Sequence, residues 1–406
     1  MELLYHTLGN GIRLVHHPVT GLVAHCGLII GTGSRDEEEH EHGLAHFSEH
    51  MLFKGTAKRK AYHILSRLED VGGELNAYTT KEETVVHASF LKDDYERAIE
   101  IISDMVFNST YPEKEIEKEK DVIIDEINSY LDNPAELIFD DFEELIFAGR
   151  SIGHSILGTP STVKCFTAGS IRDFISRNYN TSQMVFCSVG DISYARLTSL
   201  FRKYFEHIPE MKGRQCFSPP WSYKPACLTK NLDTYQDHCI IGNVAYNLRD
   251  ERRPGMFLLN NILGGQGMNS RLNLSLREKN GLAYNVESSY IPYCDTGAFS
   301  IYFGTEDQNL ERSIMAARAE LDKLRTTRLG IVQLGKARNQ IKGYLARGFE
   351  NHESLMLSLG KSLLVFDTVE DPGEIYRKID NISSSHLLET ANDIFDPDML
   401  STLIYR

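Results

Sequence analysis

The sequence contains no apolar run that approaches the ~20 residues needed to cross a bilayer. It begins with MELLYH, which has no basic segment followed by an apolar stretch, so no secretory signal is visible. We therefore expect no association with a membrane and a cytoplasmic location.

Cysteine and basic charge are also limited. The seven cysteines are odd in number and scattered, and no Cys-x-x-Cys occurs, which argues against a disulfide framework and against a thiolate zinc site. The chain has 43 basic residues against 57 acidic ones, a formal net charge of -14 at pH 7. Such a protein has no basic surface with which to displace counterions from phosphates, so we do not expect it to bind nucleic acid.

One segment is rich in residues that interrupt regular structure, namely Pro209, Gly213, Pro219, Pro220 and Pro225. Proline at this density breaks helices and central strands. In addition, 406 residues are too many for one ordinary domain. We predict an N-terminal domain over residues 1–208, a linker over residues 209–230 and a C-terminal domain over residues 231–406.

The two predicted domains resemble distant copies of each other. The apolar run GLII at 27–30 is followed by SRDE at 34–37. Roughly 210 residues later, IIGNVA at 240–245 is followed by LRDE at 248–251, and one such long offset indicates duplication of a whole domain.

Short β-branched runs alternate with longer helical patterns in this sequence. The runs predict strands at 12–15, 84–90 and 183–189. The helical patterns cover residues 61–71, 94–107, 113–130, 135–147 and 310–324. This mixture predicts an α+β fold of two homologous α/β-layer domains, each with helices packed on one face of a mainly antiparallel sheet.

The first candidate site lies in residues 43–55, GLAHFSEHMLFKG, which we predict to form one short helix that ends at Gly55. At about 100° per residue, His46, Glu49 and His50 share one stripe of this helix. The i, i+4 spacing places two imidazoles side by side as metal ligands. Glu49 is then close enough to take a proton from an attacking water. His-x-x-Glu-His is the inverzincin pattern; the alternative is a helix whose surface carries two histidines by chance.

His42 continues the spacing of four residues, because positions 42, 46 and 50 are all histidine. It precedes Gly43 and is expected to lie in a loop. We therefore leave His42 out of the ligand set.

The second candidate site lies on the predicted helix 113–130. Glu119 and Glu126 are seven residues apart and share a stripe with Val122, Ile123 and Tyr130, so we expect both carboxylates to face inward. A buried carboxylate is costly unless a cation or a metal meets it. Catalytic zinc usually takes three protein ligands and keeps one position for water, so this helix can supply the third ligand. Salt bridges to lysine or arginine are the alternative.

Five segments resemble the pitrilysin (insulinase) family of zinc metallopeptidases. The resemblance is closest to the subfamily of mitochondrial processing peptidase and its single-chain bacterial relatives. The segments are residues 43–56, 72–79, 117–127, 264–272 and 276–284. Because they span both halves, the resemblance covers essentially the whole chain and is more specific than any single motif.

The resemblance implies a zinc site of defined composition. His46, His50 and Glu126 would hold one Zn2+ per chain, Glu119 would support the site, and Glu49 would be the general base. Residues 258–264, which correspond to the first motif in the C-terminal half, contain no histidine or glutamate. A second metal site is therefore not expected.

The resemblance also implies residues that act on the substrate. Asn76 and Ala77 would pair with the backbone of an extended peptide, which is how an edge strand binds peptides without demanding a sequence. Arg277 and Tyr284 would lie opposite the zinc, with the tyrosine hydroxyl donating to the oxyanion of the reaction. A surface ion pair for Arg277 and a core position for Tyr284 are the alternatives.

These features predict a zinc-dependent endopeptidase that cleaves extended peptides or unfolded, presequence-like segments in an enclosed chamber. One alternative is a non-catalytic structural or partner subunit of a processing-peptidase-like complex, but silent members usually lose the histidines or the base, which are present here. Another is a zinc-storage or sensor protein, which would not need a base at position 49. Manganese or cobalt could also occupy two imidazoles and a carboxylate.

The resemblance bears on assembly as well. Larger relatives fuse four domains in one polypeptide, whereas this chain has two, which would make it half of a clamshell. We therefore expect a homodimer with twofold symmetry, in which Arg277 and Tyr284 of one chain complete the zinc site of the other. A heterodimer with a homologous subunit is the alternative.

Overall fold

The computed structural model describes residues 1–214, 221–232 and 234–406, which form two compact units. Unit 1 comprises the described residues of Met1–Ser129, His154–Phe217 and Arg347–Asp371. Unit 2 comprises the described residues of Tyr130–Gly153, Ser218–Ala346 and Pro372–Arg406. Part of the predicted linker, residues 215–220 with Pro219 and Pro220, lies outside the described residues.

Unit 1 contains a six-stranded sheet in the order β1-β2-β6-β3-β5-β4. Its strands are β1 (Leu4–Thr7), β2 (Arg13–Pro18), β3 (Val23–Ile30), β4 (Glu74–Thr79), β5 (Thr84–Leu91) and β6 (Met184–Gly190). The β2–β6 pair is parallel and the other pairs are antiparallel. Within the described part of the chain, β4 pairs with β5 alone and is therefore an edge strand.

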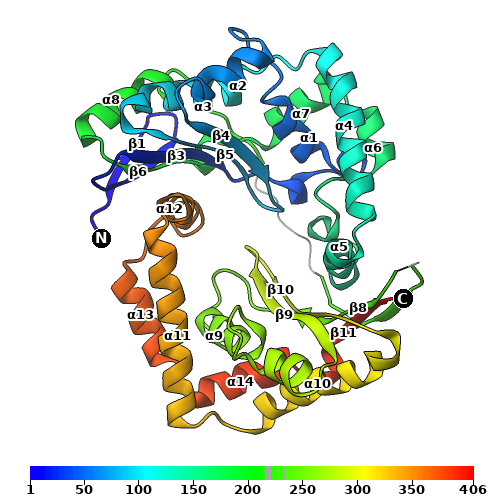
Figure 1. Cartoon of the computed structure of the whole chain (residues 1–406). Coiled ribbons are helices and arrows are strands. Elements are labelled where there is room, and N and C mark those ends of the chain that lie inside the picture. Colours follow the sequence, from blue (N-terminus) through cyan, green and yellow to red (C-terminus); the bar gives the residue numbers. More distant parts are fainter. Residues whose placement is uncertain (215–220, 233) are drawn as a thin grey trace. The chain divides into compact units, whose positions relative to one another are not determined.

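Helices cover both faces of this sheet (Figure 1). One face packs on α2 (Ala61–Glu69), α3 (Tyr95–Asn108) and α8 (Tyr194–Phe205) through a core that includes Leu28, Ile102 and Phe201. The other face packs on α12 (His352–Phe366), whose Met356 and Leu359 lie against Val185 and Val189. The remaining helices of unit 1 are α1 (Leu44–Met51), α4 (Glu113–Leu131), α6 (Pro160–Cys165) and α7 (Ala168–Asn178).

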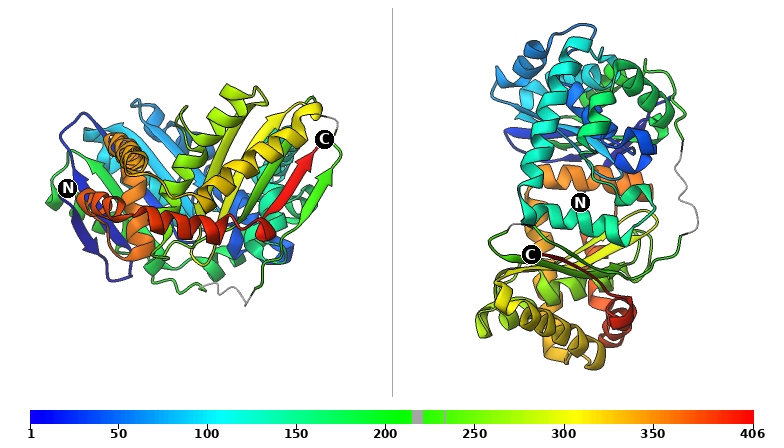
Figure 2. Two further views of the ribbon diagram at one scale, coloured as in Figure 1. Left: turned by 90° about the horizontal axis from the view of Figure 1, so that it is seen from below. Right: turned by 90° about the vertical axis from the view of Figure 1, so that its right-hand side faces the viewer.

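Unit 2 has the same type of architecture, seen from two sides in Figure 2. Its sheet has the order β7-β11-β8-β10-β9, with β7 (Cys227–Lys230), β8 (Asp237–Val244), β9 (Ala283–Pro292), β10 (Gly297–Thr305) and β11 (Ser401–Tyr405). One face packs on α9 (Arg253–Gly264), α10 (Leu310–Thr326) and α14 (Ser384–Ile394), and the other on α5 (Pro134–Ile146). Unit 2 also contains α13 (Pro372–Asn381), a π-helical turn, η6 (Asn273–Lys279), and α11 (Ile331–Glu350) as far as Ala346, after which α11 continues into unit 1.

The two sheets share one topology. Strands β2, β6, β3, β5 and β4 of unit 1 follow the same spatial order as β7, β11, β8, β10 and β9 of unit 2. In each sheet the first of these pairs is parallel and the rest are antiparallel. The predicted α+β class, with two related domains on mainly antiparallel sheets, is confirmed.

Two helices each pack on the sheet that the other half of the sequence forms. The predicted contiguous domains, residues 1–208 and 231–406, do not include this exchange. Helix α5 belongs to the N-terminal half of the sequence and lies in unit 2, whereas α12 belongs to the C-terminal half and lies in unit 1. Each helix therefore covers the second face of a sheet that was expected to carry helices on one face only. Periodicity identifies an apolar helix face, but it does not identify the sheet on which that face packs.

The predicted helices agree closely with α2, α3, α4, α5 and α10. Helix α1 is shorter than the predicted helix 43–55, because it ends at Met51 rather than at Gly55. Backbone bonds from Leu52 to Glu49 and from Phe53 to His50 tighten its last turn into i, i+3 geometry. Among the described residues, no helix is long and apolar enough to cross a membrane.

Candidate metal centre

Helix α1 carries the first candidate site, and it has an apolar face and a polar face on opposite sides. Leu44, Phe47 and Met51 are fully buried in a core shared with α4 and α7. At the start of the helix, Gly43 has φ +95°, and a side chain there would meet the carbonyl oxygen of Leu157 at 2.5 Å. Glycine is the residue that tolerates both conditions. The opposite face of the helix carries the polar side chains.

A buried carboxylate stabilises the start of α1. Glu37 accepts backbone hydrogen bonds from Gly43 at 3.0 Å and from Ala45 at 2.7 Å. These are first-turn amides that have no partner within the helix. The side chain thus holds the helix at the end nearest His46.

Helix α4 supplies the second candidate site, with one correction to the prediction. Ile123 and Ile127 are buried, as is Glu119 at 3% exposure. Glu126 has a side chain that is 45% exposed, and Val122 is 50% exposed, so the two glutamates are not a buried pair. At about 100° per residue, the buried stripe centres on the isoleucines, and Glu126 and Val122 lie further around the helix than Glu119.

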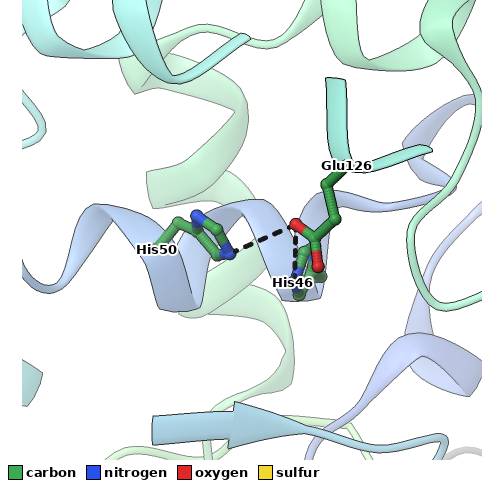
Figure 3. Close-up of side chains that lie close together, drawn as sticks. All are labelled: His46, His50 and Glu126. Atoms are coloured by element: carbon green, nitrogen blue, oxygen red, sulfur yellow. Dashed lines mark ion pairs between the residues drawn. The ribbon is translucent and has the colours of Figure 1, made fainter. Parts of the chain in front are cut away.

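His46, His50 and Glu126 come together across the two helices (Figure 3). Their ligand atoms all lie within 4.8 Å of one another. One carboxylate oxygen of Glu126 is 3.9 Å from Nε2 of His46 and 3.8 Å from Nε2 of His50. These separations exceed hydrogen-bond range. They approach the roughly 3.4 Å between ligands of a tetrahedral zinc ion with bonds near 2.1 Å.

The His46 ring is buried at 8% exposure and makes no hydrogen bond with the described residues. Its Nδ1 has no partner, and its Nε2 faces the distant oxygen of Glu126. Burial, together with the neighbouring His50, lowers the pKa of His46 to about 3. The ring is therefore neutral at neutral pH, which is the form that binds a metal. With the proton on Nδ1, the lone pair of Nε2 has no hydrogen-bond donor within reach among the described residues and could bind a cation, whereas Nδ1 stays without a protein partner.

The second imidazole is held by a carboxylate. Nδ1 of His50 lies 2.8 Å from Oε1 of Glu119, and the other oxygen of Glu119 accepts from Nζ of Lys54 at 2.6 Å. Burial favours protonation of Glu119, but the hydrogen bonds from His50 and Lys54 outweigh it and lower the pKa of this carboxyl. The ionised Glu119 fixes the tautomer of His50 with Nδ1 protonated and Nε2 free for a metal.

Glu49 lies on the same stripe but outside the ligand group. It is 7% exposed, and its Oε2 accepts a hydrogen bond from the Thr79 hydroxyl at 3.0 Å. Burial raises the pKa of Glu49, and the charges and hydrogen bonds of His50 and Thr79 oppose that rise only in part. A carboxylate with a raised pKa beside a metal site is suited to proton transfer.

Asn76 and Ala77 lie in β4, the edge strand that ends beside Glu49. Asn76 is exposed and Ala77 is half-buried. The strand pairs with β5 on one side, and no strand among the described residues pairs with its other backbone edge.

Arg277 and Tyr284 lie in unit 2. The guanidinium of Arg277 lies over the Tyr284 ring, 5.0 Å from its centre, and Tyr284 is 76% exposed at the start of β9. The alternative of a core position for Tyr284 is therefore wrong. Arg277 also approaches the carboxylate of Glu278 at 3.6 Å, so its surface ion pair exists beside the ring contact.

Residues 14–160 match the insulinase family, peptidase family M16, and residues 166–341 match the peptidase M16 inactive domain. A protein of Bacillus subtilis (strain 168), named as the uncharacterized zinc protease YmxG, is 32% identical over 401 residues, which are 98% of this chain and 97% of that protein. A protein of Rickettsia bellii (strain RML369-C), named as an uncharacterized zinc protease, is 33% identical over 399 residues, 98% of this chain and 96% of its own length.

The chain belongs to the insulinase family of peptidases, family M16. The predicted resemblance to this family is confirmed. The family's fold is also that of a solved protease from Helicobacter pylori, with a TM-score of 0.92 and 20% identity, which covers 100% of this chain and 99% of that one. The insulinase-family match includes every residue of the metal cluster, and the inactive-domain match includes Arg277 and Tyr284.

The donor set fits zinc. Two imidazole nitrogens and one carboxylate oxygen, with a further position left for water, are the ligand type of catalytic zinc sites. His42 is not in the cluster, since it follows a 3-10 turn and its ring lies 3.9 Å from that of His154.

Two contacts at this site are not in the predicted set, those of Lys54 and Thr79. Strand alternation places Thr79 on the same face as Leu75 and Ala77, but it does not pair Thr79 with Glu49. Lys54 follows the helix motif by four residues, and only the tertiary fold brings it to Glu119.

Proposed function

We propose that this chain is a zinc-dependent endopeptidase in which His46, His50 and Glu126 hold the metal and Glu49 is the general base. The arrangement of the three ligand atoms carries the proposal, since one oxygen lies 3.8–3.9 Å from two imidazole nitrogens that it does not hydrogen-bond. The insulinase-family membership and the relatives named zinc proteases support it.

When bound, zinc acts as a Lewis acid toward the scissile carbonyl and makes water a stronger acid. Glu49 then has two tasks. Its carboxylate accepts the proton of the attacking water, and its protonated form donates to the leaving amine. A raised pKa suits both steps, because the group must gain a proton and release it again near neutral pH.

We propose an extended peptide or an unfolded, presequence-like segment as the substrate. Such a segment can add to β4 as a further strand, with Asn76 and Ala77 at the point of pairing. Backbone hydrogen bonds supply affinity over several residues, so binding places few restrictions on the side chains of the peptide. The end of β4 at Thr79 brings the paired peptide toward Glu49.

The proposed enzyme acts as a homodimer with an enclosed chamber. Arg277 and Tyr284 of one chain would face the zinc site of the other, and the Tyr284 hydroxyl would donate to the developing oxyanion. Their exposure in unit 2 is compatible with that role. A heterodimer with a homologous subunit is the alternative arrangement.

The competing proposal is a non-catalytic partner subunit. The complete set of His46, His50, Glu126 and a buried Glu49 favours catalysis, because a structural subunit has no use for a buried carboxylate beside two imidazoles.

Glu49→Gln tests the proposal. We expect wild-type protein to carry about one zinc per chain and to cleave members of a peptide library. The variant should keep the zinc and lose at least ~100-fold in kcat, as on removal of a general base. Glu117→Gln is the matched control, because Glu117 is an exposed carboxylate on α4 paired with Lys120. Zinc-loaded, dimeric wild-type protein that cleaves no peptide would favour the partner subunit, and full activity of Glu49→Gln would remove the base from the mechanism.

A further inference from the structure

Strand β4 alternates between two environments. Leu75 and Ala77 pack against the core beneath α2 and α3, whereas Tyr78 packs toward α12 on the other face. Thr79 is two residues beyond Ala77, so its side chain falls on the same face as Leu75 and Ala77. Thr79 is thus the last residue of this row, and it carries a hydroxyl where the two preceding members carry apolar side chains.

That hydroxyl meets Glu49. Thr79 Oγ1 donates to Oε2 of Glu49 at 3.0 Å. In the part of the chain that the structure describes, no other hydrogen bond to this carboxylate is present, so Oε1 has no protein partner. A carboxylate held by one oxygen presents the other to a water or a substrate amine.

Several contacts hold the turn that follows Thr79. The next residue, Thr80, accepts at its carbonyl from the backbone N–H of Ser34 at 3.1 Å. Its hydroxyl also accepts from the N–H of Glu83 at 3.0 Å, which closes the turn between β4 and β5. Gly33 lies so close to this turn that an added Cβ would meet the Thr80 carbonyl oxygen at 2.4 Å.

A second anchor acts on the same turn. Lys361 of α12 pairs with Glu83 at 2.7 Å, and both residues belong to unit 1. The turn is thus held from the 3-10 segment Ser34–Asp36 and from α12, which limits the positions that Thr79 can take.

We propose that Thr79 is the positioning residue for the general base. Its hydroxyl fixes Oε2 of Glu49 and so directs Oε1 toward the reacting water. The strand that receives the peptide then also orients the base, because Thr79 is the last residue of β4. This inference rests on the proposed peptidase function.

Substitutions at Thr79 separate orientation from general stability. Thr79→Val keeps the branched shape and removes the hydroxyl, and Thr79→Ser keeps the hydroxyl. We expect Thr79→Val to lower kcat roughly 10- to 100-fold, the scale of a misplaced catalytic group, with KM and zinc content unchanged. Thr79→Ser should restore most of the rate.

Thr84→Val is the matched control. Thr84 pairs directly with Thr79 across the hairpin, is 2% exposed and donates its hydroxyl to the Thr32 carbonyl. Its loss perturbs the same hairpin without touching Glu49. Near wild-type kcat is expected, and a loss equal to that of Thr79→Val would assign the effect to hairpin stability and overturn the inference.

A double variant and a structural readout complete the test. Adding Thr79→Val to Glu49→Gln should cost nothing further in single-turnover rate, because the positioned group is already gone. In crystals of the zinc-loaded protein, the Glu49 carboxylate should be ordered in wild type and in Thr79→Ser and should take several rotamers in Thr79→Val. An ordered carboxylate in Thr79→Val would overturn the inference. Loss of order with an inactive wild type would support the contact and reject the peptidase function instead.

Discussion

Zinc affinity should depend on Glu119, although this residue does not touch the metal. Its carboxylate is 3% exposed and bridges Nδ1 of His50 at 2.8 Å and Nζ of Lys54 at 2.6 Å. Glu119→Gln keeps the shape and one acceptor oxygen but removes the charge and one acceptor. Since Lys54 is 28% exposed, its ammonium can turn to solvent, and the remaining oxygen can serve His50.

The structure therefore predicts a graded loss. With the amide oxygen still on His50, we expect Glu119→Gln to weaken zinc binding by roughly 10-fold, at the low end of the range for outer residues of metal sites. Glu119→Ala leaves Nδ1 of His50 without a partner and should approach a loss of roughly 100-fold, or about 2.7 kcal/mol. Glu126→Gln removes a ligand and should cost more than either change.

Competition with a chromophoric chelator at fixed pH measures these affinities directly. Glu115→Gln is the matched control, because Glu115 lies on the same helix and pairs at 2.8 Å with Lys118, away from the metal cluster. Its zinc affinity should equal that of wild type. If Glu119→Gln and Glu119→Ala bind zinc as tightly as Glu115→Gln, then Glu119 does not orient His50 and the reasoning fails.

Two further predictions concern assembly and pH. Glu49→Gln and Tyr284→Phe chains, each inactive alone, should recover activity when mixed if a homodimer shares its sites, and no recovery despite subunit exchange would favour sites built within one chain or a heterodimer. Zinc-free protein should lose stability as the pH falls from 6.5 toward 4, because burial lowers the pKa of His16 to about 4 and that of His46 to about 3. In that window the unfolded chain binds more protons, so the free energy of unfolding should rise with pH by up to about 1.4 kcal/mol per pH unit for each histidine. Burial raises the pKa values of Glu37 and Glu49, and those carboxyls contribute in the opposite sense. In urea titrations from pH 4.5 to pH 6.5, the free energy of unfolding should therefore rise more steeply with pH for wild type than for His16→Asn, and equal slopes would contradict the assignment.

Local sequence predicted the elements that carry the site. The His-x-x-Glu-His spacing places His46, Glu49 and His50 on one stripe of any helix, and α1 is that helix. Helix α4 begins at Glu113, the first residue of the predicted helix 113–130. These features depend on interactions between residues close in sequence, so the amino-acid sequence alone is enough to predict them.

Burial along α4 depends on its neighbours and could not be predicted. The seven-residue spacing of Glu119 and Glu126 suggested equal burial, yet the first is 3% exposed and the second has a side chain that is 45% exposed. Both lie at the margin of the buried stripe, where a small rotation decides between the core and solvent. The packing of α4 on α1 sets that rotation.

The sequence by itself determined which residues can bind a metal, where α2, α3, α4, α5 and α10 lie along the chain, and that the two halves are related. The tertiary structure alone decided three things: that α5 and α12 each cover the sheet formed by the other half, that Lys54 reaches Glu119, and that Thr79 holds Glu49. The physical reason is the same in each case. Periodicity and capping act over a few residues, whereas these contacts join segments whose separation along the chain leaves no trace in local pattern, and only the packing of apolar faces brings them together.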